Sequence, residues 1–438
     1  MLNKIKTLVK SDNGLVLMGN LSASALGLFT FMLLTRGLSK TDFGAWTLFI
    51  SASGLLDLMR TGMVRQALVR SLAIEKVESK HPGILSAAGV LAGLITFIFA
   101  TLIFGIHLSV DTSQWSLHLF FKYYPVLAVI SLPSSFDTWK SHAQNQYGRM
   151  NAIRLFVNVL FILSVTIGLF SEFELVHFLW VYLGAQALVS IYSILSNLWK
   201  TPWLSATKSQ VYSLFQYGRH SLATLAGSNL LKSADSLLIG AFLGTGAVAI
   251  YAIPLKVLDL MEIPLRGFVM TSFNKLSRAH AEGKHHDFKA IVRRQVSQLT
   301  ILFLPVAIFI LFMPDLVIQV LGGDGYQDSS LVLRILLIPM ILLPLDKFVG
   351  ISFDSIGQPG INALKVWIMV IVNILGDLIV LYFFQSLWLV ALVTVLNILM
   401  GIVFGLINHP HIDFAIFKLR PSAYQKSSIR FQSAKTEA

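Results

Sequence analysis

Twelve long apolar blocks follow one another along this chain of 438 residues. Each block is about 20 residues long, which is the length an α-helix needs to cross the hydrocarbon core of a bilayer. The blocks lie near residues 14–35, 43–64, 84–107, 118–139, 151–170, 175–198, 220–243, 246–270, 297–321, 329–349, 361–384 and 387–408. They are continuously apolar, whereas a lipid-facing barrel strand alternates apolar and polar residues. The sequence therefore predicts an all-α polytopic membrane protein with twelve transmembrane helices.

Composition excludes several classes of protein. Charged residues make up 13% of the chain, about half of the roughly 25% typical of soluble domains. The absence of cysteine excludes thiolate nucleophiles and cysteine-ligated metals. The sequence has no GxxxxGK[ST] phosphate loop and no GxSxG nucleophile motif. His285, His286, His409 and His411 fall in polar segments without carboxylate or cysteine partners, so no metal site is expected.

The net charge of +12 is explained by membrane topology and not by a nucleic-acid partner. Most of the 34 lysine and arginine residues lie before the first block, in alternate loops or in the C-terminal tail, whereas the opposite loops contain only Arg36 and Lys40. The positive-inside rule then places both termini in the cytoplasm. The polar and basic segment 271–296 is predicted to form an amphipathic helix at the membrane surface.

The polar segment 199–219 divides the blocks into two groups of six. We predict an N-terminal six-helix lobe over 1–198, a cytoplasmic linker over 199–219, a C-terminal six-helix lobe over 220–408 and a basic cytoplasmic tail over 409–438. The tetrapeptide LDLM occurs at 56–59 and again at 258–261. These positions correspond in the two halves, as a duplicated transporter requires.

Several polar and charged residues lie inside the predicted spans, where an ionisable side chain is unfavourable unless it is paired or hydrated. Helical phase places the following on shared faces: Asn20 in the first span; Asp57 and Arg60 in the second; Asn229, Lys232 and Asp235 in the seventh; Lys256, Asp259, Glu262 and Arg266 in the eighth. We predict that these faces line a hydrated cavity. Acidic and basic residues balance across the second, seventh and eighth spans, so purely structural ion pairs three residues apart are the alternative.

Other intramembrane charges have different interpretations. Lys347 and Lys365 lie near cytoplasmic helix ends, where long side chains usually extend to the lipid headgroups. Asp377 lies well inside the eleventh span, and Asn373 shares its face. Asp377 could carry a coupling proton or sodium ion, or it could hydrogen-bond to a neighbouring helix in its protonated form. Pro133 and other prolines inside spans are expected to kink their helices.

Four stretches carry a resemblance to a known family. The runs LTRGLSKTDFGAW at 34–46 and GMVRQALVR at 62–70 resemble the start of bacterial polysaccharide-biosynthesis flippases, which move lipid-linked oligosaccharides and belong to the multidrug/oligosaccharidyl-lipid/polysaccharide exporter superfamily. The second half repeats the likeness at DSLLIG (235–240) and AIYA (249–252). The resemblance implies two six-helix lobes around a central cavity that opens alternately to either side of the bacterial cytoplasmic membrane. In that superfamily the first, second, seventh and eighth helices line the cavity.

The resemblance implies a flippase for polyprenyl-pyrophosphate-linked oligosaccharides, such as O-antigen units, and no enzymatic activity or cofactor. Its partners would be this substrate, membrane lipids and the polysaccharide assembly machinery, and its coupling would use protons, sodium or the membrane potential. The residues assigned to phosphate oxygens are Lys232, Lys256 and Arg60, and those assigned to orient them or to bind sugar hydroxyls are Asp57, Asp235 and Asp259.

Two alternatives remain open from the sequence. A multidrug or organic-cation antiporter of the same fold should have a net acidic site, with Asp57, Asp259 and Asp377 as ligands. A membrane glycosyltransferase or polysaccharide polymerase is a remote alternative, because the predicted outer loops are short and lack paired metal-binding acids.

Overall fold

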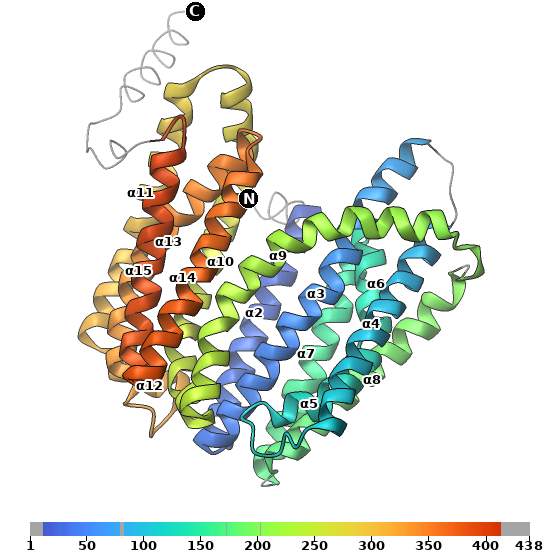
Figure 1. Ribbon diagram of the computed structural model, residues 1–438, viewed down its shortest axis with the longest axis horizontal. Coiled ribbons are helices and arrows are strands. Elements are labelled where there is room, and N and C mark those ends of the chain that lie inside the picture. Colours follow the sequence, from blue (N-terminus) through green and yellow to red (C-terminus); the bar gives the residue numbers. More distant parts are fainter. Residues whose placement is uncertain (1–11, 79–82, 172, 202, 413–438) are drawn as a thin grey trace, which may run out of the picture.

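The computed structural model describes residues 12–78, 83–171, 173–201 and 203–412. Within these ranges the regular structure is helical, and the helices form two bundles that lie side by side (Figure 1). The predicted basic N-terminal segment over 1–11 and most of the predicted basic tail, 413–438, lie outside the described residues.

The N-terminal bundle contains the first six predicted spans. Its helices are α2 (Asp12–Gly37), α3 (Lys40–Glu78), α4 (Ile84–Ser109), α5 (His118–Ile130), α6 (Leu132–Ala143), α7 (Tyr147–Phe170) and α8 (Leu175–Ser196). α5 and α6 are together long and apolar enough to cross a membrane, and they meet at an angle of 50° at Ser131. Pro133 lies in the first turn of α6, where its missing N–H interrupts the helix. The predicted proline kink is thus confirmed at this position.

The C-terminal bundle follows two short 3₁₀ turns, η1 (Leu198–Lys200) and η2 (Trp203–Ser205). Its helices are α9 (Lys208–Leu243), α10 (Thr245–Ala281), α11 (His285–Phe312), α12 (Pro314–Gly322), α13 (Ser329–Ser355), α14 (Pro359–Phe383) and α15 (Leu387–Asn408). α9 begins inside the segment 199–219 because Thr207 and Gln210 form a capping box, in which each side chain accepts the other residue's backbone N–H.

The prediction of a separate interfacial helix over 271–296 is wrong. α10 continues to Ala281 and α11 begins at His285, so the two helices extend past the apolar blocks and meet in a tight turn. The Glu282 carboxylate fixes this turn, since it accepts hydrogen bonds from Lys284 Nζ and Arg278 Nε at 2.7 Å each. These two cations lower the pKa of Glu282 to about 2.

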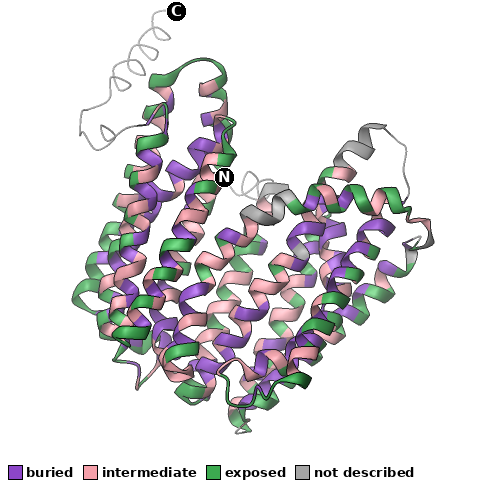
Figure 2. Ribbon diagram, in the orientation of Figure 1, coloured by how far each residue is buried: buried purple, intermediate pink, exposed green. Residues whose placement is uncertain are grey.

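Among the described residues, seven helices are long and apolar enough to cross a membrane. Counting the bent α5–α6 pair as one span gives eight candidate spans. The other long helices are α3, α9, α10 and α13, which carry many of the intramembrane charges. Large apolar side chains such as Phe97 (69% exposed) and Ile301 (69%) are exposed, whereas Asp235 and Asp377 are buried. Exposed positions recur along the helices of both bundles (Figure 2). This outward apolar surface suits lipid as the surrounding solvent. The chain is a multi-pass membrane protein.

The two bundles contact each other near the α12–α13 connection. Thr35 Oγ1 donates to the carbonyl of Leu321 at 3.0 Å, and Arg36 Nη2 donates to the carbonyls of Gln319 and Val320 at 3.1 and 2.7 Å. The segment 199–207 and the α10–α11 turn lie at the opposite end of the molecule, where the bundles are farther apart (Figure 1). Hydrogen bonds thus join α2 to α12 at this end, which we call the held end, while α9 also packs against α3, with Met63 beside Gly218 and Leu225 beside Gly62.

Gly44 lies at a close approach between α3 and α10 at this held end. A Cβ at Gly44 would lie 1.7 Å from the carbonyl oxygen of Thr245, which is backbone and cannot turn away. We expect Gly44→Ala to lower stability by about 1–3 kcal/mol, the usual effect of overpacking, and to lower the melting temperature of the purified protein. Gly246→Ala is the matched control, because a Cβ there has Thr41 Cγ2 at 3.9 Å as its near neighbour. Equal melting temperatures for the two variants would contradict this interpretation.

Candidate functional site

A cavity of about 1070 Å³ lies between the two bundles. It is lined by α2, α3, α7 and α8 from the N-terminal half and by α9, α10, α13, α14 and α15 from the C-terminal half. Its volume is at the upper end of the range of about 300–1,000 Å³ that is typical of small-molecule sites. The cavity therefore offers room for a ligand larger than a typical small molecule.

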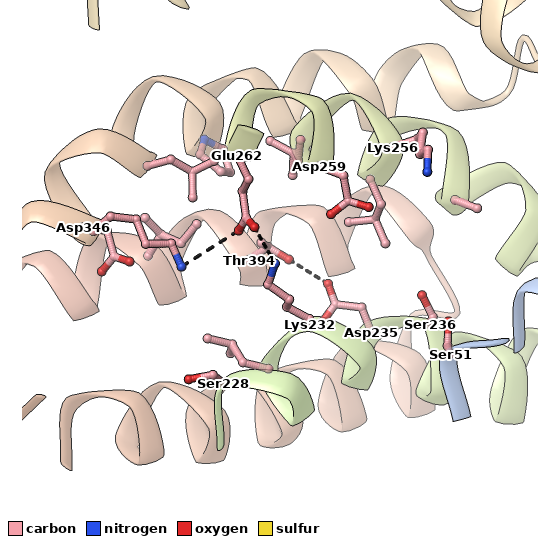
Figure 3. A pocket seen from close by; sticks show the side chains of 18 of the residues that line it. Ser51, Ser228, Lys232, Asp235, Ser236, Lys256, Asp259, Glu262, Asp346 and Thr394 are labelled. Carbon is pink, nitrogen blue, oxygen red and sulfur yellow. Dashed lines mark hydrogen bonds and ion pairs between the residues drawn. The ribbon is translucent and has the colours of Figure 1, made fainter. Parts of the chain in front are cut away.

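The structure brings five of the predicted site residues together on this cavity: Lys232, Asp235, Lys256, Asp259 and Glu262 (Figure 3). The first two belong to α9 and the other three to α10. The three α10 residues are spaced by three positions, which keeps them on one face of the helix. Asn229 on the predicted face of α9 and Arg266 on that of α10 are not part of the lining.

Arg60 and Asp57 lie inside the N-terminal bundle, away from the cavity lining. The buried Arg60 guanidinium is 2.9 Å from the Asp57 carboxylate. Its other hydrogen bonds go to Thr96 Oγ1 at 3.3 Å, to Ser131 Oγ at 3.1 Å and to the carbonyl of Ala128. All of these partners belong to the N-terminal bundle, so the position of this ion pair favours a structural role.

The other four predicted residues also lie outside the cavity lining. Arg266 is largely exposed and pairs with Glu262 at 2.8 Å. Asn20 is exposed on α2, and Asn229 donates to the carbonyl of Leu225 in its own helix at 2.7 Å. Asp377 is fully buried beside cavity-lining Asn373.

Glu262 is surrounded by cations. Lys232 Nζ lies 2.5 Å from Glu262 Oε2, and Lys347 Nζ lies 3.9 Å from Glu262 Oε1 (Figure 3). Arg266 contacts the same carboxylate from the exposed side. Three cations therefore share one carboxylate. Over the whole lining, as far as the structure describes it, four lysines (Lys232, Lys256, Lys347 and Lys365) face five carboxylates (Asp235, Asp259, Glu262, Asp346 and Asp354). Lys347 lines the cavity, where the sequence had favoured extension to the headgroups.

Lys365 is also part of the cavity lining, and the prediction that it extends to the headgroups is wrong. Its side chain is 3% exposed, and Nζ lies 2.5 Å from Asp346 Oδ1 and 3.1 Å from the Asp346 carbonyl. The pair joins α13 to α14. Sequence periodicity describes one helix at a time and could not identify a partner on another helix.

A polar cluster centred on Asp235 borders the cavity inside the C-terminal bundle. Asp235 accepts hydrogen bonds from Tyr251 Oη at 3.0 Å, Thr394 Oγ1 at 3.0 Å and Asn373 Nδ2 at 2.7 Å. Asn373 Nδ2 also donates to Asp377 Oδ2 at 3.0 Å. One amide thus bridges two carboxylates, and like charges held this close in a low-dielectric site require a proton or a cation.

The sequence analysis missed three members of this cluster, Tyr251, Thr394 and Asn397. Asn397 Nδ2 donates to Asn373 Oδ1 at 3.0 Å and so holds the bridging amide in place. Asp377 Oδ1 is buried without a hydrogen-bond partner among the described residues. Polar residues inside the last span were a signal that could have identified Thr394 and Asn397.

The N-terminal half lines the cavity with aromatic and uncharged polar residues. Trp46 stacks on Phe161 with ring centroids 5.3 Å apart, and Tyr182 meets Trp46 edge-on at 5.6 Å. Among the described residues, the charged side chains of the lining all come from the C-terminal half. Lys256 Nζ lies 5.2 Å from the ring centre of Phe31 and connects the two surfaces. The cavity therefore has an aromatic side and a charged side.

Comparison with known proteins gives the family. A model of the family described as "Polysaccharide biosynthesis protein" matches residues 10–280. The "Probable low-salt glycan biosynthesis flippase Agl15" of Haloferax volcanii is 24% identical over 217 residues, which cover 47% of this chain and 46% of that protein. The match thus spans about half the length of this relative.

Solved structures show the fold. The lipid II flippase MurJ in an inward closed conformation superposes with a TM-score of 0.73 at 16% identity, covering 92% of this chain and 89% of MurJ. An inward-facing multidrug resistance MATE family transporter of the MOP superfamily has a TM-score of 0.72 at 14% identity, covering 87% of this chain and 93% of that one.

The predicted family is thereby confirmed, and so is the likeness of the fold to that of the exporter superfamily. The matched region covers more than half of the chain, and the fold is the one found in MATE transporters and in MurJ. This chain therefore belongs to the polysaccharide biosynthesis protein family.

Proposed function

We propose that this protein is a flippase that moves polyprenyl-pyrophosphate-linked oligosaccharides across the bacterial cytoplasmic membrane for surface polysaccharide biosynthesis. The family supports the pathway, and the flippase name of the Haloferax relative supports the activity. The observation that carries the proposal is the division of the cavity lining into an aromatic, uncharged side and a charged side on which Lys232 and Lys347 both contact Glu262. Such a lining suits a ligand with sugars at one end and an anion at the other.

In this proposal Lys232, Lys347 and Lys256 bind the pyrophosphate. Lys232 and Lys347 share one carboxylate, so each ammonium group keeps N–H donors for phosphate oxygens. Sugar rings would pack their apolar faces on Trp46 and Phe161, while nearby hydroxyl and amide side chains bind their hydroxyl groups. The polyprenyl tail would remain in lipid between the bundles.

The topology that we propose has twelve spans, with both termini in the cytoplasm. The eight candidate spans and the four long charged helices α3, α9, α10 and α13 together give six spans in each half. In this topology the held end of the molecule, around Arg36 and Gln319, is the outer side. Transport then requires these contacts to break while the bundles meet at the cytoplasmic end.

The test of the proposal is a gene deletion followed by complementation. We expect the deletion to abolish surface polysaccharide and to accumulate lipid-linked oligosaccharide on the cytoplasmic face, where added glycosidase does not reach it in intact spheroplasts. The wild-type gene should restore both. Unchanged polysaccharide together with raised sensitivity to cationic dyes would overturn the proposal and support the organic-cation antiporter.

A further inference from the structure

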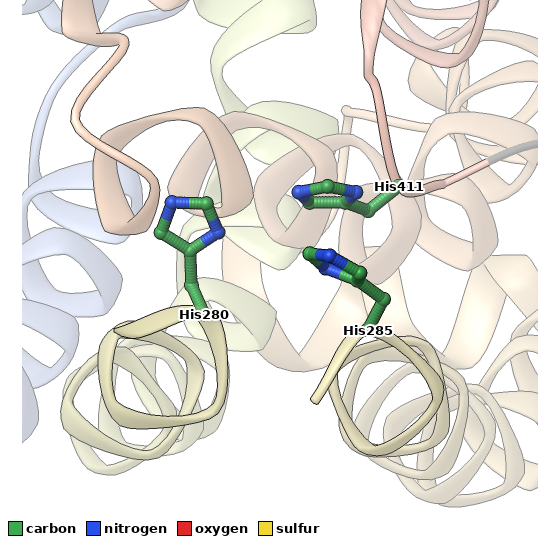
Figure 4. Close-up of side chains that lie close together, drawn as sticks. All are labelled: His280, His285 and His411. Atoms are coloured by element: carbon green, nitrogen blue, oxygen red, sulfur yellow. The ribbon is translucent and has the colours of Figure 1, made fainter. Parts of the chain in front are cut away.

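Three histidines from distant parts of the chain converge at the end of the C-terminal bundle that carries the α10–α11 turn. His280 is in the last turn of α10, His285 begins α11, and His411 follows α15. Their rings point toward one another (Figure 4). One ring nitrogen from each residue lies within 4.8 Å of the others. His285 and His411 stack with ring centroids 4.1 Å apart, and His280 lies 5.5 Å from His411.

Hydrogen bonds hold the backbone beside these histidines in place. His280 Nδ1 is buried and has no hydrogen-bond partner among the described residues. His409 Nδ1 accepts the backbone N–H groups of His411 and Ile412 at 3.1 Å each, which folds the chain after α15 back toward α10. The Glu282 carboxylate fixes the tight turn between His280 and His285. The cluster is thus built from a fixed turn and a fixed C-terminal segment.

We propose that His280, His285 and His411 form a binding site for a divalent transition-metal ion, with Zn²⁺ as the ion of choice. Imidazole nitrogen is a preferred ligand of zinc, and three protein ligands with one open position are a common arrangement. Ligand nitrogens of a tetrahedral zinc site lie about 3.3 Å apart, from Zn–N distances of about 2.0–2.1 Å. Rotation of the exposed His285 side chain can close the remaining distance. The unpartnered nitrogen of His280 would then have a metal ion to bind.

Such a site would connect the segment after α15 to the α10–α11 turn. These elements are contiguous in space but far apart in sequence, so the metal closes a long loop of chain. The ion would bind the folded protein in preference to the unfolded chain, and it would therefore stabilise this end of the C-terminal bundle. No metal site is expected from the sequence, because His285, His286, His409 and His411 lack carboxylate or cysteine partners in their segments.

The test uses the full-length protein with an affinity tag that contains no histidine, purified in detergent and stripped with EDTA. Zinc binding is measured by competition with a chromophoric chelator, and the melting temperature is recorded with and without Zn²⁺. We expect one zinc ion per chain and a higher melting temperature in zinc. The variants His285→Ala and His411→Ala should each weaken zinc binding at least tenfold and remove the thermal shift.

His286→Ala is the matched control, since His286 is an exposed neighbour of His285 that is not part of the cluster. This variant should bind zinc within twofold of the wild type. Absence of stoichiometric zinc binding in the wild type would overturn the proposal, as would equal affinities in His285→Ala and His286→Ala. The outcome of this test does not depend on which substrate the protein transports.

Discussion

Replacing Lys232 and Lys347 together by glutamine is expected to reduce flipping of a lipid-linked oligosaccharide at least a hundredfold. Both lysines line the cavity and share Glu262, so the double variant removes two of the four lysines that could bind phosphate oxygens. A hydrogen bond to a charged group contributes about 1.5–3 kcal/mol, and two such losses correspond to more than two orders of magnitude. The measurement is the initial rate of translocation in proteoliposomes, with polysaccharide rescue in the deletion strain as the cellular readout.

Two further variants make this result specific. Lys122→Gln removes an exposed lysine outside the cavity and should leave the rate within twofold. Glu262→Gln keeps every cation and should keep substrate binding, since Glu262 then no longer competes with the anionic ligand for Lys232 and Lys347. An organic-cation antiporter would respond in the opposite way, losing activity in Glu262→Gln and keeping it in the lysine variant. That pattern would refute the assignment of these lysines to phosphate.

Asp377→Asn is expected to remove the dependence of transport on its driving ion and to lower the rate at least about thirtyfold. Asn373 bridges Asp377 and Asp235, and the oxygen-rich surroundings suit a proton or a hard cation such as sodium. Asparagine retains the size of the side chain and can accept the same hydrogen bond, so the bundle should fold. The change removes the negative charge that balances the bound cation.

The measurement compares translocation rates in proteoliposomes under sodium and pH gradients imposed one at a time. The wild type should respond to one of these gradients, and Asp377→Asn to neither. Asp324→Asn, in the exposed connection between α12 and α13, is the control and should behave like the wild type. If Asp377→Asn retained the full response to the gradient, the carboxylate pair would not be the coupling site.

Part of the site was predictable from the sequence because it depends on single helices. The spacing of Lys256, Asp259 and Glu262 fixes one face of α10, and Lys232 and Asp235 fix one face of α9. The pairing within these faces was not predictable. The spacing along α9 would allow Lys232 to pair with Asp235, three residues away. In the structure Lys232 instead pairs with Glu262 on the neighbouring helix.

The sequence by itself determined that the chain crosses a membrane through two comparable halves, because apolar block length and charge placement are local properties that the bilayer constrains directly. It also predicted the family. Only the tertiary structure decided that Arg60 belongs to the interior of its own bundle, that Lys365 pairs with Asp346, and that three distant histidines converge. These contacts depend on which helices are neighbours and how each is rotated about its axis, and packing of the whole bundle sets both.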